Sequence, residues 1–231
     1  MPEKIRTKSR RTPFRRIFKP AWLYLLSRSL EPLSPTFGSN RGEPVDRYYI
    51  DKFLLENSDF IHGNCLEIED NIYTLKFGKN ITRSDILDFD ARNSRANYHA
   101  DLRNMPEIKD AAYDCIILTQ VLSFIDDYDA AIKECRRILK PNGVILATLS
   151  IMGRIDGRAK QEGDYWNFKP ASARYIFGKH FENENLEIKS CGNVLSGLGY
   201  WIGMAQEELT KIELDHIDPR FPIMVTVRAR K

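Results

Sequence analysis

The chain has 231 residues, 42% of them hydrophobic, which is enough to bury the core of one α/β domain with an appendage. Its formal net charge at pH 7 is only +3, and it contains no run of about 18 consecutive apolar residues. This balance argues against a nucleic-acid binder that is basic throughout, and it gives no sign of a membrane-spanning helix.

The basic residues are concentrated at the N-terminus. Residues 1–19 hold eight Lys or Arg and one Glu, so the rest of the chain is net acidic. A short apolar run follows at residues 21–26, too short for the core of a signal peptide, and then a segment rich in Pro, Ser and Gly. We interpret residues 1–40 as a basic extension and linker, and residues 41–231 as one domain.

The extension has two interpretations. Trp22, Leu23, Leu26 and Leu30 can share one face of a helix with Lys and Arg nearby, which suits docking to a membrane surface or to a partner protein. The simpler interpretation is a solvated tail with one helix packed on the domain or on a second copy. Nucleic acid is the weakest alternative.

The four cysteines lie at positions 65, 115, 135 and 191, without a CxxC pair and without a His at metal-ligand spacing. This pattern predicts free thiols in a reducing compartment, and so a cytoplasmic protein without a metal site.

From residue 41 onward, helical and strand patterns alternate. Pro44 begins a helix whose apolar residues Val45, Tyr49 and Phe53 recur at helical spacing. The later elements, in chain order, are the strand "CLEIE" with a tight turn and a helix after it, the strand "SDILDFD", the strand "YDCIILTQVL", the amphipathic helix "DDYDAAIKECRRILK", the strand "VILATLS", a helical insert at about 195–220 that contains "GLGYWIGMAQEEL", and the final strand "IMVTVRAR". This alternation predicts an α/β fold, a mainly parallel sheet with helices on both faces.

In such sheets, ligands bind beyond the carboxyl ends of the strands. The residues at those positions are rich in acids and amides: 67–71, 88–90, Asp101, Thr119 with Gln120, and Ser150 onward. Structural loops are polar too, so this composition only weakly favours a binding site.

Two stretches carry a family resemblance. "YDCIILTQVLSFIDDYDAAIKECRRILKPNGVILATLS" and "GDYWNFKPASARYIF" resemble segments of the class I S-adenosylmethionine-dependent methyltransferases. The resemblance implies a Rossmann-like seven-stranded methyltransferase sheet, parallel except for an antiparallel last strand. "RGEPVDRYYIDKFL", "LEIEDNIYT", "CIILTQ" and "GNVL" further resemble a type 11-like bacterial subgroup that is often found with glycosyltransferases and polysaccharide genes.

The resemblance also implies a role for individual residues. Glu67 takes the place of the acid that ends the first strand and orders the methionine end of the cofactor. Asp88 or Asp90 takes the place of the acid that accepts bonds from both ribose hydroxyls, and Asp101 and Leu102 that of the pair at the adenine. Thr119 and Gln120 line the cofactor near the methyl group.

The loop after the first strand departs from the family pattern. The family carries glycines there, where this chain has Glu69, Asp70, Asn71 and Tyr73. We expect Asn71 to make the sharp turn, because Asn tolerates left-handed geometry, whereas Glu69 adds bulk and charge near the cofactor carboxylate. Arg47 or Arg41 would offset that charge if the helix before the strand folds over the cofactor.

Few residues suit chemistry on the acceptor. Asp164, after the fifth strand, is the candidate catalytic base, and Gln120 is the second catalytic candidate. Tyr165 and Trp166 can stack on a sugar ring. Alternatively, Trp166 and Phe168 are core residues and Asp164 caps the next helix.

Three further features receive simpler interpretations. His99 is a poor base candidate because it precedes the adenine-contacting pair. His180 and His216 have no partner in the sequence and are interpreted as surface residues. Gly199 and Gly203 have the spacing of a helix-packing motif, so the insert either covers the substrate or packs against a second subunit.

The sequence thus predicts a bacterial S-adenosylmethionine-dependent methyltransferase that methylates a small or glycan-type acceptor at oxygen. A lipid or a small metabolite near the membrane is an alternative acceptor. The alternative of another class is a non-catalytic methyltransferase-like module that binds a partner protein or a glycan assembly.

Overall fold

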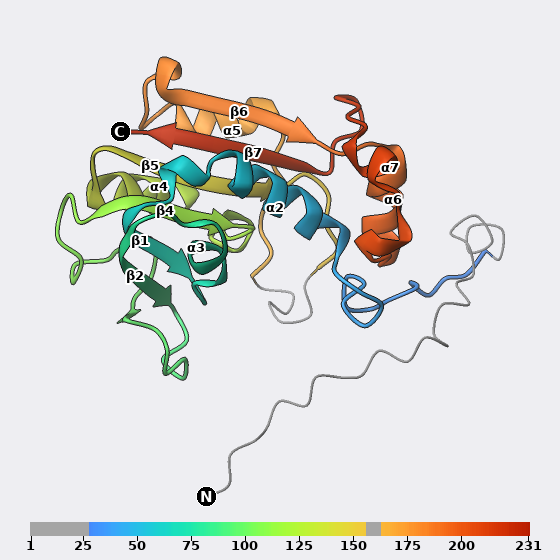
Figure 1. Cartoon of the computed structure of the whole chain (residues 1–231), viewed down its shortest axis with the longest axis horizontal. Helices are drawn as coiled ribbons and strands as arrows, with labels where there is room; N and C mark the ends of the chain where they lie inside the picture. Colours follow the sequence, from blue (N-terminus) through green and yellow to red (C-terminus); the bar gives the residue numbers. More distant parts are fainter. Residues whose placement is uncertain (1–27, 156–162) are drawn as a thin grey trace, which may run out of the picture.

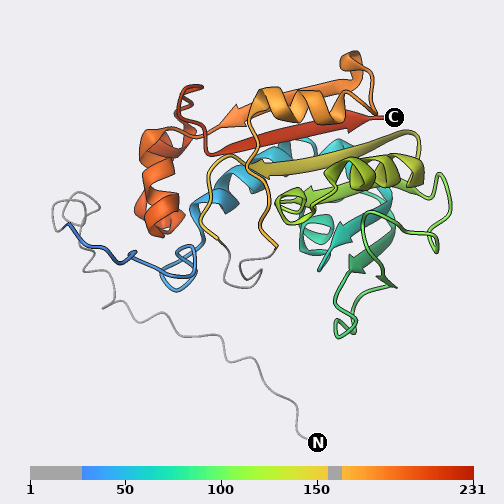
Figure 2. The same cartoon turned by 180° about the vertical axis from the view of Figure 1, so that it is seen from behind.

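The computed structural model describes residues 28–155 and 163–231, which form an α/β fold around one sheet (Figures 1 and 2). The predictions for residues 1–27, including the basic run and Trp22 to Leu26, lie outside the described residues. The strands are β1 (Gly63–Ile68), β2 (Ile81–Asp88), β3 (Tyr98–His99), β4 (Tyr113–Thr119), β5 (Leu139–Ser150), β6 (Leu186–Cys191) and β7 (Met224–Arg230). The helices are α2 (Val45–Glu56), α3 (Ile72–Phe77), α4 (Tyr128–Ile138), α5 (Pro170–Phe177), α6 (Val194–Ile202) and α7 (Lys211–Asp215), with short 3-10 turns at Ser58–Phe60, Leu122–Phe124, Asn183–Asn185 and Gln206–Glu208.

Within the described residues, the sheet has seven strands in the order β3-β2-β1-β4-β5-β7-β6. Neighbouring strands from β3 to β5 pair in parallel, and β7 runs antiparallel to both β5 and β6. The predicted seven-stranded sheet with an antiparallel last strand is therefore confirmed. The strand order reverses direction at β1 and β4, which is the switch point where such sheets bind ligands.

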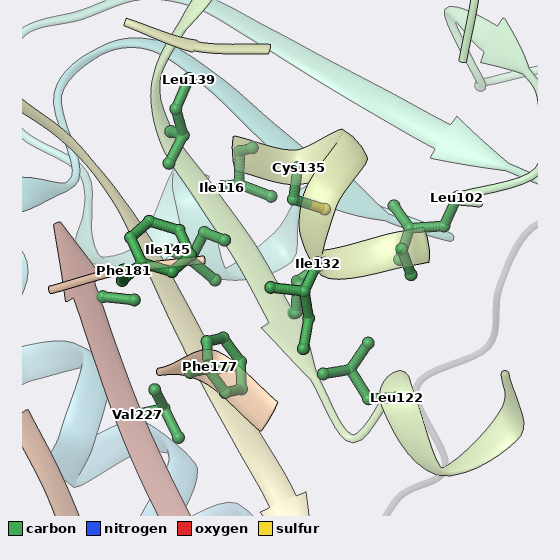
Figure 3. Packing of buried hydrophobic residues seen from close by; sticks show 14 of the residues in the cluster. Leu102, Ile116, Leu122, Ile132, Cys135, Leu139, Ile145, Phe177, Phe181 and Val227 are labelled. Atoms are coloured by element: carbon green, nitrogen blue, oxygen red, sulfur yellow. The ribbon is translucent and has the colours of Figure 1, made fainter. Parts of the chain in front are cut away.

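Helices cover both faces of the sheet. In Figure 1, α2 lies in front of the sheet, and the opposite view in Figure 2 has α4 and α5 in front. One buried cluster joins α4 and α5 to the sheet: Figure 3 shows Ile132 and Cys135 of α4 and Phe177 of α5 packed around Ile116 and Ile145. A second cluster joins α2 to the other face through Cys65, Cys115 and Ile117.

Helix α4 shows how the local sequence sets these elements. Asp127 is its N-cap, with Oδ1 accepting a hydrogen bond of 3.0 Å from the amide of Ala130. Arg136 and Arg137 occupy the last turn, where they complement the helix dipole. Its apolar face is buried, as the amphipathic pattern predicts.

Three elements differ from the sequence expectations. The two-residue strand β3 was not predicted. Strand β5 begins at Leu139 and includes the "PNG" turn, where its pairing with β4 shifts register. The helical stretch at 197–209 is instead α6, which starts at Val194 after the N-cap Asn193, followed by the separate turn Gln206–Glu208.

Gly203 ends α6 in the left-handed region, with φ +84°. A Cβ at this position would lie 2.5 Å from the carbonyl oxygen of Ser34. The chain before α2 runs along this helix end, where Leu33 donates a backbone hydrogen bond of 2.8 Å to Ile202. The glycine is therefore required by packing within the chain, and the expected contact with a second subunit stays a prediction, as does the domain boundary near residue 40.

No helix among residues 28–155 and 163–231 is long and apolar enough to cross a membrane. Within the same ranges, no cluster of three His, Cys, Asp or Glu side chains is arranged to hold a metal ion. All four cysteines are free, and three of them are buried.

Candidate functional site

The parallel strands bring the predicted cofactor residues to one edge of the sheet. Ile68 at the end of β1 pairs with Leu87 of β2, and Glu67 pairs with Ile117 of β4. The residues that follow β1, β2 and β4 therefore meet at the carboxyl edge beside the switch point.

Glu67 organises the first turn of α3. Its side chain is 2% exposed, and its carboxylate accepts hydrogen bonds from the amide of Tyr73 (3.1 Å) and from both the amide and the hydroxyl of Thr74 (2.8 Å each). Burial raises the pKa of Glu67 to about 7, and these three donors oppose the shift. Glu67 thus joins the end of β1 to the helix start, and its role toward the methionine end of the cofactor stays a prediction.

Glu69, not Asn71, takes the left-handed backbone geometry. Glu69 has φ +67°, whereas Asn71 has φ −126°, so the expectation that Asn71 makes the sharp turn is wrong. The turn forms at residue 69 because the Glu69 amide bonds the carbonyl of Leu87, which fixes the backbone directly after the strand. Asp70 and Asn71 hold the loop by side-chain hydrogen bonds to the amide of Ile72 (3.1 Å) and to the hydroxyl of Ser84 (3.0 Å).

The structure separates the two candidates for ribose recognition. The side-chain amide of Asn93 bonds both the Glu69 carbonyl (2.8 Å) and the Asp88 carboxylate (2.7 Å). Asp88 therefore lies against the loop that follows β1. Asp90 instead forms an exposed ion pair with Arg92, which lowers the pKa of Asp90 to about 2. The geometry favours Asp88, and its role stays a prediction.

Asp101 and Leu102 follow β3. Arg103 donates to the Asp101 carboxylate through its backbone amide and its guanidinium, and this pairing lowers the pKa of Asp101. The Leu102 side chain is 5% exposed and belongs to the core, so only its backbone is available to a ligand. Arg103 also pairs with Asp126, which links this loop to the one after β4.

The end of β4 is strained. Thr119 is the last residue of the strand, and Gln120 follows it with φ +59°, held by hydrogen bonds from its amide to the carbonyl and hydroxyl of Thr148. The Gln120 Oε1 atom is buried and has no hydrogen-bond partner among the described residues. Strained backbone and unpaired polar atoms gather at functional sites, so both features support the candidate role of Gln120.

The start of α2 completes this edge. Arg47 Nη1 donates to the Tyr73 hydroxyl (3.1 Å), which brings α2 to the loop after β1. Arg41 lies elsewhere, paired with Glu208 through two hydrogen bonds. Of the two arginines expected near Glu69, only Arg47 is therefore placed at the loop.

Asp46 was missed by sequence reasoning. An acid in the first turn of a helix is normal, because it complements the helix dipole, and no signal marked this one. In the structure, its side chain is 7% exposed and its Oδ1 has no hydrogen-bond partner among the described residues. Burial raises the pKa of Asp46, against the opposing field of Arg47.

The segment after β5 crosses to the loop after β4. The amides of Tyr165 and Trp166 both bond the Ser123 carbonyl, and the Trp166 indole donates to the carbonyl of Ile125 (2.9 Å). Trp166 remains 39% exposed and only Phe168 is buried, so the core interpretation fits Phe168 alone. Lys169, not Asp164, is the N-cap of α5, which rules out the capping interpretation of Asp164.

A groove of about 360 Å³ lies beside this segment. Aromatic, acidic and basic side chains line it: Asp126, Asp127, Tyr128, Asp129, Trp166 and Lys179. Tyr128 packs edge-on against Trp166 at 5.4 Å between ring centroids, which fixes the indole. His180 bonds Asp129 at 3.1 Å and its side chain is only 15% exposed, so it is more buried than the surface interpretation expected.

Residues 70–147 match a family model described as a methyltransferase domain. No curated protein sequence matches the chain.

Several solved structures share the fold. One is a methyltransferase of Thermotoga maritima, described as a possible histamine N-methyltransferase, with 18% identity, 81% of this chain and 91% of that chain covered, and a TM-score of 0.52. Another is the N-methyltransferase NodS of Bradyrhizobium japonicum in complex with S-adenosyl-L-homocysteine. It is 15% identical, the match covers 92% of this chain and 98% of that chain, and the TM-score is 0.52. The cyclase SpnF is also similar, with 16% identity and a TM-score of 0.54, and the match covers 79% of this chain and 80% of that chain.

The fold is therefore that of the class I S-adenosylmethionine-dependent methyltransferases. The matched residues 70–147 run from the loop after β1 into β5 of this fold. NodS holds S-adenosyl-L-homocysteine, the product that S-adenosylmethionine leaves after methyl transfer. S-adenosylmethionine is therefore the cofactor against which the site of this chain is compared.

The residues at the carboxyl edge fit this cofactor chemically. It carries two ribose hydroxyls and a cationic sulfonium, and the edge offers the carboxylates of Asp88 and Asp101. Two buried oxygen acceptors, Asp46 Oδ1 and Gln120 Oε1, lack a partner among the described residues, as expected where a ligand supplies the donors.

Proposed function

We propose that this protein transfers a methyl group from S-adenosylmethionine to an oxygen of a small or glycan-type acceptor. The observation that carries the proposal is the set of acids at the carboxyl ends of successive strands, around a loop whose residue 69 is held in left-handed geometry. A bacterial, cytoplasmic protein of polysaccharide biosynthesis is part of this proposal and rests on the subgroup resemblance.

Each residue has a defined task in this proposal. Asp88 accepts hydrogen bonds from the ribose hydroxyls, Asp101 and the Leu102 backbone hold the adenine, and Glu67 keeps the loop in place through α3. When bound, the cofactor supplies an electrophilic methyl group. The protein contributes by aligning the acceptor oxygen with that methyl group and by excluding water.

Two residues are proposed to act on the acceptor. Gln120 orients it through the unpaired Oε1 atom, which lies after β4 at the switch point. Asp164 takes the hydroxyl proton, as a carboxylate within reach of an acceptor at this edge can do. An oxygen acceptor needs such a base, whereas a neutral amine is already nucleophilic.

The groove beside Trp166 supports a glycan-type acceptor. Sugar rings bind to exposed aromatic faces, while carboxylates accept hydrogen bonds from their hydroxyls. The groove combines a half-exposed Trp166 with three acids and lies next to the loop after β4.

The proposal is tested by methyl transfer from radiolabelled S-adenosylmethionine to a panel of sugars, nucleotide sugars and lipid-linked glycans. We expect the label in a glycan product, with strongly reduced incorporation in the Trp166→Ala variant. The control is Tyr175→Ala, which removes an exposed aromatic side chain from α5 and should leave the incorporation unchanged. Label in small amines or lipids but in no sugar would contradict the glycan assignment.

One observation favours a second function. Glu69 places a charged side chain where the family has glycine, a change expected if cofactor binding had been lost. The protein would then be a non-catalytic module that docks a partner protein or a glycan assembly, with the basic extension as its dock. Absence of cofactor binding, together with capture of a partner that depends on residues 1–27, would favour this function.

A further inference from the structure

Asp46 has one unpaired carboxylate oxygen in a buried position. It is the second residue of α2, its side chain is 7% exposed, and no described residue donates a hydrogen bond to its Oδ1. Buried acceptors in proteins are nearly always bonded, so an unpaired carboxylate oxygen requires a donor that the chain itself does not supply.

The position of Asp46 defines where that donor comes from. Helix α2 precedes β1 and runs back along the sheet, so its first turn lies at the carboxyl edge. Arg47 bonds the Tyr73 hydroxyl (3.1 Å), and the Tyr73 amide bonds the Glu67 carboxylate (3.1 Å). The first turns of α2 and α3 and the end of β1 thus form one hydrogen-bonded network around the loop after β1.

Asp46 and Arg47 carry opposite charges on consecutive residues. In the described part of the chain, Arg47 has one side-chain hydrogen bond, to Tyr73, so other guanidinium donors are available. A neighbouring acid and base match a ligand group that carries both an ammonium and a carboxylate. The methionine end of the cofactor is such a group.

We propose that Asp46 and Arg47 form the recognition site for the amino-acid end of the cofactor, with Asp46 accepting from the α-ammonium and Arg47 donating to the α-carboxylate. This inference rests on the proposed function. In the family, glycines let the backbone amides of this loop approach the cofactor. Here the Cβ atoms of residues 69, 71 and 73 keep those amides away from it. The inference explains how the chain binds the cofactor nonetheless, because charged side chains of α2 replace the amides.

The test compares two adenosine ligands by isothermal titration calorimetry. S-adenosylhomocysteine carries the amino-acid end, and 5′-methylthioadenosine has the same adenosine and a thioether but no amino-acid end. We expect Asp46→Asn to weaken S-adenosylhomocysteine binding roughly 10-fold or more and to change 5′-methylthioadenosine binding less than about 2-fold. Arg47→Met should show the same selectivity.

Asp51→Asn is the matched control, because it removes the same charge from a partly exposed position of α2. It should leave both affinities unchanged. Equal loss for both ligands in Asp46→Asn, or no loss for either, would overturn the inference while leaving the proposed function intact. A wild-type protein that binds neither ligand would overturn both.

A stability measurement separates recognition from a structural role. Asp46→Asn removes a buried charge whose Oδ1 atom has no hydrogen-bond donor among the described residues, so the melting temperature of the variant should equal or exceed that of the wild type. S-adenosylhomocysteine should then raise the melting temperature of the wild type more than that of the variant. A variant that melts earlier and responds normally to S-adenosylhomocysteine would point to a structural role.

Discussion

Single residues at the carboxyl edge differ sharply in how they are held, although several are the same amino acid. Asp88 and Asp90 are two positions apart, yet Asp88 is tied by Asn93 to the loop after β1, and Asp90 forms an exposed pair with Arg92. The sequence left open which of the two binds the ribose hydroxyls. Because only Asp88 is tied to the loop, we expect the two residues to differ in their effect on cofactor binding.

The Asp88→Ala variant should weaken S-adenosylhomocysteine binding by about 1–3 kcal/mol, the cost of losing a buried bond to a polar ligand. Asp101→Ala should fall in the same range. Asp90→Ala should leave the affinity unchanged, because the Asp90 carboxylate is half exposed and already paired with Arg92. Calorimetric titration of the three variants measures this, and an effect of Asp90→Ala as large as that of Asp88→Ala would contradict the assignment.

Glu67 gives the fold a pH dependence. Its pKa is raised by burial from 4.5 to about 7, so folding favours the protonated carboxyl. The preference of the folded state for protonated Glu67 adds at most about 3 kcal/mol to the free energy of unfolding. This contribution is fully present below the unfolded-state pKa and is lost as the pH rises through about 7. The free energy of unfolding from urea titrations should therefore fall between pH 5 and 8.

The Glu67→Gln variant is the control for this dependence. It cannot ionise, so its free energy of unfolding should vary less over the same pH range. Identical slopes for the wild type and the variant would show that another group is responsible.

Glu69 stores backbone strain. A non-glycine residue at φ +67° costs about 1–2 kcal/mol, which glycine avoids. Glu69→Gly should therefore be about 1 kcal/mol more stable than Glu69→Ala, since both variants lose the same side-chain contacts and only glycine relieves the strain. Chemical denaturation of the pair measures this, and equal stabilities would mean that the loop relaxes without glycine.

At the scale of elements, what the sequence predicts depends on how local the determinants are. Strand β4 and helix α4 were predicted because a continuous apolar run and an amphipathic pattern are contained within each. Strand β3 has two residues and is defined only by its pairing with β2, so no local sequence pattern predicts it. Asp46 looks like an ordinary first-turn acid, and only the packing around α2 reveals that it is buried.

The N-cap of α4 offers a test at this scale. Asp127→Ala removes the side-chain acceptor of the Ala130 amide and should lower the free energy of unfolding by about 1 kcal/mol. Asp110→Ala, which breaks the exposed pair with Arg137, is the control and should cost less, since surface ion pairs contribute about 0–1 kcal/mol. The reverse order in denaturant titrations would contradict the capping assignment.

For the whole molecule, the sheet order and the antiparallel β7 place Glu67, Asp88 and Gln120 at one switch point, though they are far apart in the sequence. The sequence identified this edge because acids follow successive strands and because the family resemblance ordered them. It did not separate Asp88 from Asp90 or find Asp46, because these distinctions arise from contacts between distant segments.

Cofactor binding by the glycine-free loop is the central claim, and titration of S-adenosylhomocysteine into the purified full-length protein by isothermal calorimetry tests it most directly. The account predicts one site per chain with micromolar affinity, weakened by Asp88→Ala and unchanged by Asp90→Ala. No detectable binding at millimolar ligand, with the protein folded by circular dichroism, would contradict it and would favour the non-catalytic module.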